Sequence, residues 1–243
     1  MTHPEGVRLL SLQDAPFAGA TGDGVRVAII DSGVTAGHPH VGAVLNGVRI
    51  GADGEDAEYS DRVGHGTAVA GAIREKVPDA ELLAVRVFDR ELTTTAGILA
   101  RAIEWAVLHK AQIINVSLGT PNAAHAERLA AAVQLADEAG ALVVAAATNA
   151  GRPVWPGALP SVVAVEAAWD VPRDVIRVGD RPDGSLLLWA SAFPRPISGV
   201  PAERNLQGVS FAVANATGFL ARFRQANADA RSIAQVREAL TRG

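Results

Sequence analysis

Short apolar runs alternate with helix-length segments along most of this chain, and this alternation limits the fold more than any other feature. The runs are rich in valine and isoleucine and contain few polar residues, as is typical of strands that are buried on both faces. They cover residues 25–30, 43–50, 81–88, 112–118, 141–147 and 161–166. The pattern predicts a mostly parallel sheet with both faces covered.

Amphipathic helices are expected at residues 96–110 and 123–139, and two more at 209–225 and 229–242. Alternating strands and helices imply right-handed crossovers. We therefore predict an α/β fold, a three-layer doubly wound, mostly parallel sheet with helices on both faces and a ligand site at the carboxyl ends of the strands. Residues 171–201, rich in Pro, Gly and Asp, predict loops around a hairpin or an edge strand.

Composition excludes several classes of function. The 243 residues carry 22 basic and 26 acidic side chains, and no basic run is present that would bind a nucleic acid or an anionic membrane. Cysteine is absent, so no disulfide, thiolate nucleophile or cysteine metal site can form. Without a linker, a repeat or a secretory signal, we expect residues 1–243 to form a single domain without a propeptide, in the cytoplasm.

Polar residues stand where predicted strands give way to helices. Asp31 directly follows an apolar run, and Gly33 allows a sharp turn after it. His65 lies between two glycines at a junction of loop and helix. Each has an ordinary alternative, because Asp31 could cap a turn and an isolated histidine is usually a surface or core residue.

Asn149 and Ser210 occupy comparable positions. Asn149 follows the run 141–147 and offers two amide N–H donors to a developing oxyanion, or serves an ordinary turn. Ser210 begins a helix rich in small residues, where backbone N–H groups are free, or is simply an N-cap. In combination, Asp31, His65 and Ser210 predict an orienting acid, a base and a nucleophile on one edge of one sheet.

Five segments carry a specific resemblance to a known family. In chain order they read AIIDSGV, GHGTAVAG, INVSLG, AAATNAG and GVSFAVA. They resemble the successive signature blocks of the subtilisin-like serine proteases (subtilases), in the same order and at nearly the same spacing, over roughly residues 20 to 225. The resemblance implies a subtilisin-like fold and a serine endopeptidase.

The resemblance also implies roles for individual residues. Asp31, His65 and Ser210 would form the catalytic triad, and Asn149 would be the side-chain oxyanion donor. Such a mechanism uses no metal and no other cofactor.

Substrate-binding residues follow from the same blocks. Ser117, Leu118 and Gly119 would pair with the substrate backbone as an added strand. Val154 stands where the family often keeps a glycine at the base of the first specificity pocket, so we expect a narrow pocket.

The sequence departs from the family pattern beside the proposed nucleophile. The family's serine block usually reads Gly-Thr-Ser-Met-Ala-x-Pro, whereas Val209, Phe211 and Ala214 replace Thr, Met and Pro here. Ala68 stands where a second histidine is usual. These changes leave the nucleophile and base in place.

The family's calcium loop, inserted in the helix after the histidine, is missing from the short segment 72–81, so we expect no calcium site there. An acidic loop offers a weaker candidate for a cation, because its spacing does not match the EF-hand pattern. Its residues are Asp53, Glu55, Asp56, Glu58 and Asp61.

We therefore predict a serine endopeptidase that acts on a peptide or protein substrate, with a processing role and an activating partner protein left open. The alternatives are a catalytically inactive subtilase-like peptide-binding module and a peptide macrocyclase or transpeptidase. The macrocyclase would need an added helical cap, for which 243 residues leave no room. A nucleotide-binding α/β domain is disfavoured, since no Gly-x-Gly-x-x-Gly or P-loop follows the first strand.

Overall fold

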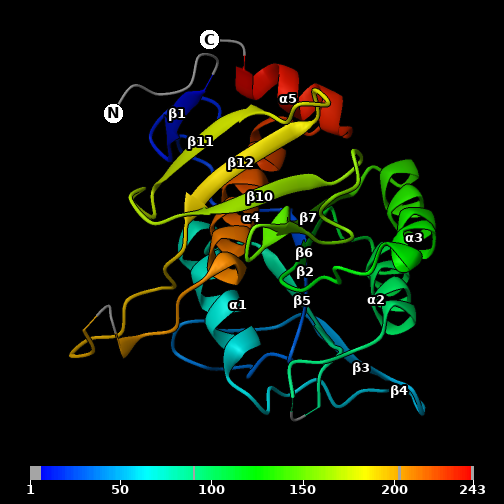
Figure 1. Cartoon of the computed structure of the whole chain (residues 1–243). Helices are drawn as coiled ribbons and strands as arrows, with labels where there is room; N and C mark the ends of the chain where they lie inside the picture. The colour runs from blue at the N-terminus through cyan, green and yellow to red at the C-terminus, as the bar shows by residue number, and fades with distance from the viewer. Residues whose placement is uncertain (1–6, 90, 202–203, 242–243) are drawn as a thin grey trace.

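A ten-stranded sheet runs through the middle of the molecule, as the computed structural model in Figure 1 shows. The structure describes residues 7–89, 91–201 and 204–241. The strand order is β1-β11-β12-β10-β7-β6-β2-β5-β3-β4. Neighbours from β12 to β3 are parallel, and antiparallel pairs lie only at the two edges. The predicted α/β class with a mostly parallel sheet is confirmed.

The strands of the parallel part match the apolar runs of the sequence. Because helices cover both faces, nearly every position in these strands is buried, and the sequence shows uninterrupted runs instead of alternation. Residues 43–45 are an exception, since they lie in a loop before their strand. The bounds are β2 (Arg26–Asp31), β3 (Asn46–Gly51), β5 (Glu81–Arg86), β6 (Ile113–Val116), β7 (Leu142–Ala146), β10 (Val163–Ala168) and β12 (Leu186–Ser191).

The stretch 171–201 contains the antiparallel hairpin of β11 and β12, and the hairpin is part of the main sheet. β12 is not an edge strand, because β10 pairs with its other side in parallel. Four short strands, β1, β4, β8 and β9, were not predicted from the sequence. The remaining strands are β1 (Arg8–Ser11), β4 (Gly54–Asp56), β8 (Thr148–Asn149), β9 (Arg152–Pro153) and β11 (Val175–Asp180).

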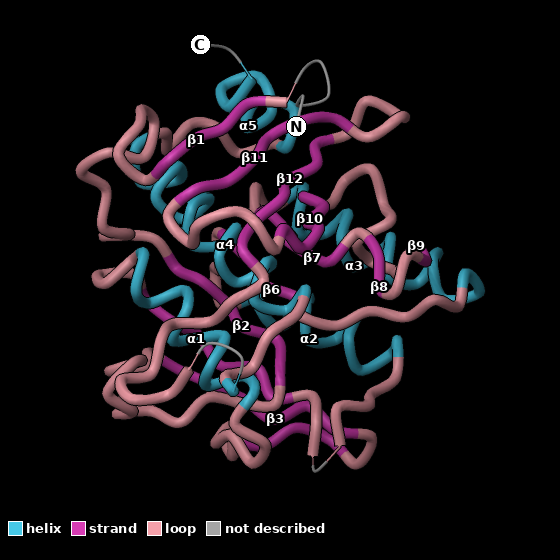
Figure 2. The backbone as a smooth tube through the Cα atoms, turned by 60° about the vertical axis from the view of Figure 1, so that its left-hand side comes forward, coloured by secondary structure: helices cyan, strands magenta, loops and turns pink. Residues whose placement is uncertain are grey.

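Helices cover the sheet on both sides. α1 and α4 pack on one face, and α2 and α3 pack on the other (Figures 1 and 2). The 3-10 turn η1 leads into α3, while α5 begins four residues later than predicted. The bounds are α1 (His65–Lys76), α2 (Ala96–Leu108), η1 (Ala123–His125), α3 (Ala126–Glu138), α4 (Val209–Ala226) and α5 (Ile233–Thr241).

The helix α4 is buried along most of its length, and its small residues make this possible. From Phe211 to Ala221 every residue is buried. At Gly218, an added Cβ would lie 2.6 Å from Cδ of Lys76 on α1, so the two helices approach closely there. All the helices of the described ranges lack the long apolar stretch that a membrane span requires.

Candidate active site

His65, the first residue of α1, contacts Asp31, the last residue of β2. Asp31 is fully buried at the carboxyl end of β2, and its Oδ1 lies 2.7 Å from Nδ1 of His65. The backbone N–H of Ser32 donates to the same oxygen at 2.7 Å. The imidazole remains reachable, because 16% of the His65 side chain is exposed. The structure thus places the predicted acid and base in direct contact.

Glycine allows this approach of α1 to β2. A Cβ at Gly66 would overlap the carbonyl oxygen of Gly33 and lie 3.1 Å from Cβ of Asp31. Gly33 itself has φ +102° and its own Cβ would overlap the carbonyl oxygen of Tyr59. A larger residue at Gly66 would therefore push the helix and the strand apart, and one at Gly33 would displace the loop at Tyr59.

Asp61 holds the first turn of α1. Its Oδ1 accepts the N–H groups of Val63 and Gly64 at 2.9 and 2.8 Å, and its Oδ2 accepts the N–H and the hydroxyl of Thr67 at 2.8 and 2.6 Å. Burial alone would raise the pKa of Asp61, but these hydrogen bonds together hold that pKa below its ordinary value. The sequence prediction gives Asp61 no role beyond the acidic loop and the start of the segment that leads to His65, although an Asp just before a helix is a capping signal.

The carboxylates around His65 decide its affinity for a proton. Burial, the largest influence, lowers the pKa of His65. The hydrogen bond and charge of Asp31, together with the charge of Asp61, outweigh burial and raise the pKa above the ordinary value of 6.5. The site therefore stabilises the imidazolium ion that forms when His65 accepts a proton.

Ser210 is the second residue of α4. Gly208 precedes the helix with φ +140° and provides no side-chain cap, and the N–H of Ser210 lies in the first turn, where no intrahelical acceptor exists. The hydroxyl of Ser210 donates to the carbonyl of Ser117 at 3.3 Å. Phe211 packs against His65, so the start of α4 lies beside the start of α1. No hydrogen bond joins Ser210 to His65 in the described part of the chain.

The predicted substrate strand lies against the segment that contains Val154. A Cβ at Gly119 would lie 3.2 Å from Cβ of Val154. Next to it, Thr120 and Trp155 exchange two backbone hydrogen bonds of 2.9 Å. Val154 is 4% exposed, and its side chain lies against Gly119.

Leu118 is partly buried and packs against the core on the α2–α3 face, whereas Asn149 is exposed in the hairpin of β8 and β9. The turn of this hairpin has positive φ at Ala150 and Gly151. The Asn149 side chain forms no hydrogen bond with any described residue, so its amide N–H groups are free to bind a ligand. The structure does not join Asn149 to Ser210.

Asn115 connects β6 to α4 and had not been singled out from the sequence. It is fully buried, donates from Nδ2 to Oγ of Ser117 at 2.8 Å, and accepts at Oδ1 from the Thr217 hydroxyl at 3.1 Å. It therefore fixes Ser117 relative to the helix that carries Ser210. A polar residue inside an apolar strand is the signal that could have identified it.

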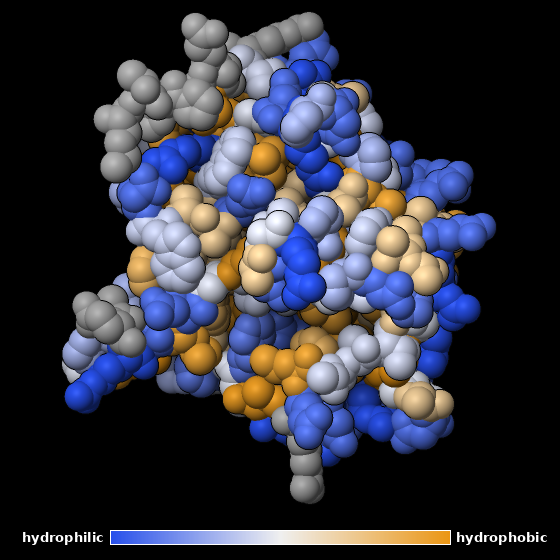
Figure 3. Space-filling model, in the orientation of Figure 1, coloured by the Kyte–Doolittle hydropathy of each residue, from blue (hydrophilic) through white to orange (hydrophobic). Residues whose placement is uncertain are grey.

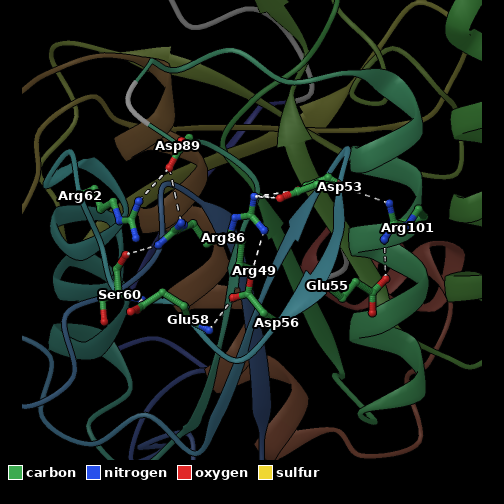
Figure 4. A network of polar contacts seen from close by, with 11 residues as sticks. Arg49, Asp53, Glu55, Asp56, Glu58, Ser60, Arg62, Arg86, Asp89 and Arg101 are labelled. Carbon is green, nitrogen blue, oxygen red and sulfur yellow. Dashed lines mark hydrogen bonds and ion pairs between the residues drawn. The ribbon is translucent and has the colours of Figure 1, made fainter.

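Three carboxylates of the acidic loop, those of Asp53, Glu55 and Asp56, pair with arginine side chains (Figure 4). Nη2 of Arg49 lies 2.7 Å from Oδ1 of Asp53, and its Nη1 lies 2.8 Å from Oδ2 of Asp56. Nη2 of Arg101 lies 2.8 Å from Oε1 of Glu55. Among the described residues, no group of three or more His, Asp or Glu side chains is arranged to hold a metal ion.

Comparisons with known proteins find similar sequences and a similar fold. A model described as the subtilase family matches residues 22–182, which contain Asp31, His65 and Asn149 but end before Ser210. A thermostable alkaline protease of Halalkalibacterium halodurans is 36% identical over 177 residues, covering 68% of this chain and 47% of that protein. Subtilisin E of Bacillus subtilis is 35% identical over 182 residues, covering 68% and 46%. The minor extracellular protease Epr of Bacillus subtilis is 36% identical over 170 residues, covering 65% and 25%.

The chain thus spans about half or less of the length of these relatives. Its fold is similar to the crystal structure of a cold adapted subtilisin-like serine proteinase, with a TM-score of 0.70 and 25% identity. That match covers 90% of this chain and 82% of the other. The agreement of sequence and fold over most of the chain means that it belongs to the subtilase family.

Proposed function

We propose that this chain is a serine endopeptidase, with Asp31, His65 and Ser210 as its catalytic triad. The observation that best supports the proposal is the 2.7 Å contact between His65 Nδ1 and the buried carboxylate of Asp31. The start of α4, with Ser210, lies beside this pair through the contact of Phe211 with His65. We also propose that the chain acts as one catalytic domain.

The triad groups have complementary roles in the reaction. Oγ of Ser210 attacks the carbonyl carbon of the scissile peptide bond while Nε2 of His65 accepts the hydroxyl proton. Asp31 holds the other ring nitrogen in its protonated form and stabilises the imidazolium. His65 then returns the proton to the leaving amine, the C–N bond breaks, and an acyl ester on Ser210 remains. Water, deprotonated by His65, hydrolyses this ester.

The negative charge on the tetrahedral intermediate needs hydrogen-bond donors. The free N–H of Ser210 in the first turn of α4 is one, and the amide of Asn149 is the second. In a subtilisin the loss of a side-chain donor lowers kcat about 10²- to 10³-fold, and we expect the same order for Asn149→Ala.

Residues Ser117, Leu118 and Gly119 would bind the acyl part of the substrate as an added strand, and Val154 would close the first specificity pocket from below. A processing role, an activating partner and a cytoplasmic location are further proposals, supported by sequence features only. Cell fractionation and co-purification of the full chain test the last two.

Labelling with a fluorophosphonate tests the nucleophile directly. We expect the wild type to be labelled and to cleave peptides, and Ser210→Ala to fold normally while losing both properties. Ser185→Ala, in the turn between β11 and β12, is the matched control and should react like the wild type. If folded wild-type protein is not labelled, the inactive peptide-binding module is the better assignment.

A further inference from the structure

A pocket of about 430 Å³ opens at the start of α1, where Gly64, the residue before His65, lines it. One wall is formed by Gly64, Thr67 and Ala68 at the start of α1. Residues 194–200 and 204–206, from the connection between β12 and α4 that protrudes from the molecule in Figure 1, supply the facing wall. Residues 117–119 and 154 do not line this pocket, so it is distinct from the proposed binding site of the acyl part.

The pocket is lined by basic groups without a carboxylate among its described lining residues. Arg195 donates only to the carbonyl of His40 at 3.4 Å, and Arg204 has no side-chain partner in the described part of the chain. Burial, the largest influence, and the charges of Arg195 and His38 lower the pKa of His40, which favours its neutral form. Two guanidinium groups thus line the pocket, and neither forms an ion pair with a carboxylate of residues 7–89, 91–201 or 204–241.

Apolar side chains complete the same wall. Ile197, Val200 and Leu206 are 45%, 38% and 48% exposed. Figure 3 shows hydrophilic and apolar residues side by side on this protruding segment. A pocket with such a lining suits a short peptide segment that carries both aliphatic groups and a carboxylate.

The proposed mechanism determines which part of a substrate reaches the pocket. The acyl part lies along residues 117–119, on the side where Ser210 contacts Ser117. His65 must protonate the leaving amine, so the leaving segment passes His65 and enters the space lined by Gly64 and Thr67.

Resting on the proposed function, we propose that this pocket, which we call the arginine pocket, binds a carboxylate in the leaving segment of the substrate. An extended segment advances about 3.3 Å per residue, so the test covers each of the first three residues after the scissile bond. The carboxylate comes from an acidic side chain or from the carboxyl terminus of a short leaving segment.

Paired peptides test this proposal. In the first set, each of the three positions after the scissile bond carries Glu in one peptide and Gln in its partner. In the second set, the peptides end at one of these three positions, with either a free or an amidated carboxyl terminus. We expect kcat/KM to be about tenfold higher for the peptide with the carboxylate, which corresponds to 1.4 kcal/mol. The first set detects a side-chain carboxylate and the second set a terminal one.

Charge variants assign the effect to the pocket. Arg204→Glu should abolish or reverse the preference, and Arg195→Gln should reduce it. Arg128→Glu, on the exposed surface of α3, makes the same change in net charge away from the site and should keep the wild-type preference. Equal loss in Arg128→Glu would overturn the proposal, because the effect would then be one of net charge.

A measurement of peptide binding distinguishes a failure of this proposal from a failure of the proposed function. Anisotropy of labelled Glu and Gln peptides is measured with the Ser210→Ala protein, which binds without cleaving. Cleavage by the wild type without any carboxylate preference in rate or binding disproves the arginine pocket and leaves the peptidase standing. Preferential binding of the Glu peptide without cleavage by the wild type supports the pocket and disproves the peptidase.

Discussion

The ring of Phe211 packs against the imidazole of His65, with centroids 5.6 Å apart and ring planes inclined by 49°. Phe211 is also 2% exposed and anchors the first turn of α4 in the core. One side chain therefore supports both the proposed base and the helix that carries the proposed nucleophile. It stands where the family usually has methionine.

Phe211→Met should be tolerated, because a volume-conserving apolar exchange costs less than about 1.5 kcal/mol. Phe211→Ala should cost about 3–5 kcal/mol and also slow fluorophosphonate labelling of the folded protein, since His65 loses one wall. Urea unfolding and labelling rates measure the two effects. Phe219→Ala, which is equally buried in α4 but contacts Phe17, should lose stability without the change in rate.

Asp31→Asn should lower the pKa of His65, because the hydrogen bond and the charge of Asp31 raise it in the wild type. The rate requires neutral His65, so the pH at which labelling is half-maximal should move down. The maximal rate should fall by about 10⁴, as for the same change in another Ser-His-Asp protease. An upward shift of the midpoint in pH–rate profiles would contradict this role. Asp89→Asn, on an exposed loop, should leave the midpoint in place.

Val154 should limit the size of the P1 side chain. Its Cβ lies next to Gly119, so a large aromatic group would have to displace it at a cost of about 1 to 3 kcal/mol. Small and medium apolar P1 residues should be cleaved about ten- to a hundredfold better than Phe or Tyr, and Val154→Gly should reduce that ratio. A P1-varied peptide library gives both numbers. A wild-type preference for Phe would disprove this part of the assignment.

Lys76 should make stability depend on pH. Its ammonium group is buried and donates to Oδ1 of Asn215 at 2.5 Å, and burial lowers its pKa from 10.5 to about 7. Between about pH 7 and 10.5 the unfolded chain binds this proton and the folded chain does not, so the free energy of unfolding rises with pH in that window. Lys76→Met should remove this rise, as melting temperatures across the window would show. If the difference in melting temperature between the wild type and Lys76→Met stays constant across this window, Lys76 titrates normally.

EDTA should leave both the labelling rate and the melting temperature unchanged. The triad reaction uses no metal, and Asp53, Glu55 and Asp56 are already bound to arginine. A melting temperature lowered by many degrees, and restored by Ca²⁺, would locate a cation at this loop. Asp53→Asn would then be expected to abolish the effect.

The sequence predicted the parallel strands because burial on both faces produces long apolar runs, as in β2 and β7. It missed β1 and β4, because strands of three or four residues exist through pairing with distant segments and need no pattern of their own. The same limit explains the position of β12, where only the structure shows that β10 and β11 flank it.

Some residues of the candidate site could likewise be predicted from the sequence, and others could not. Asp31 and His65 could be identified locally, because each stands at a strand or helix boundary beside a glycine. Asn115 acts through Thr217, which lies 102 positions later, and the arginine pocket joins His40 to Arg195, 155 positions apart. Such contacts depend on how the layers pack, and no local pattern reports them.

The burial of α4 ties the nucleophile to the stability of the whole fold. A helix enclosed between α1 and the sheet has no local route of opening, so its central amide protons should exchange with solvent only through global unfolding. Ser210, in the first turn of that helix, should therefore lose its reactivity together with the native state. Active-site titration of a sample would then count its folded molecules.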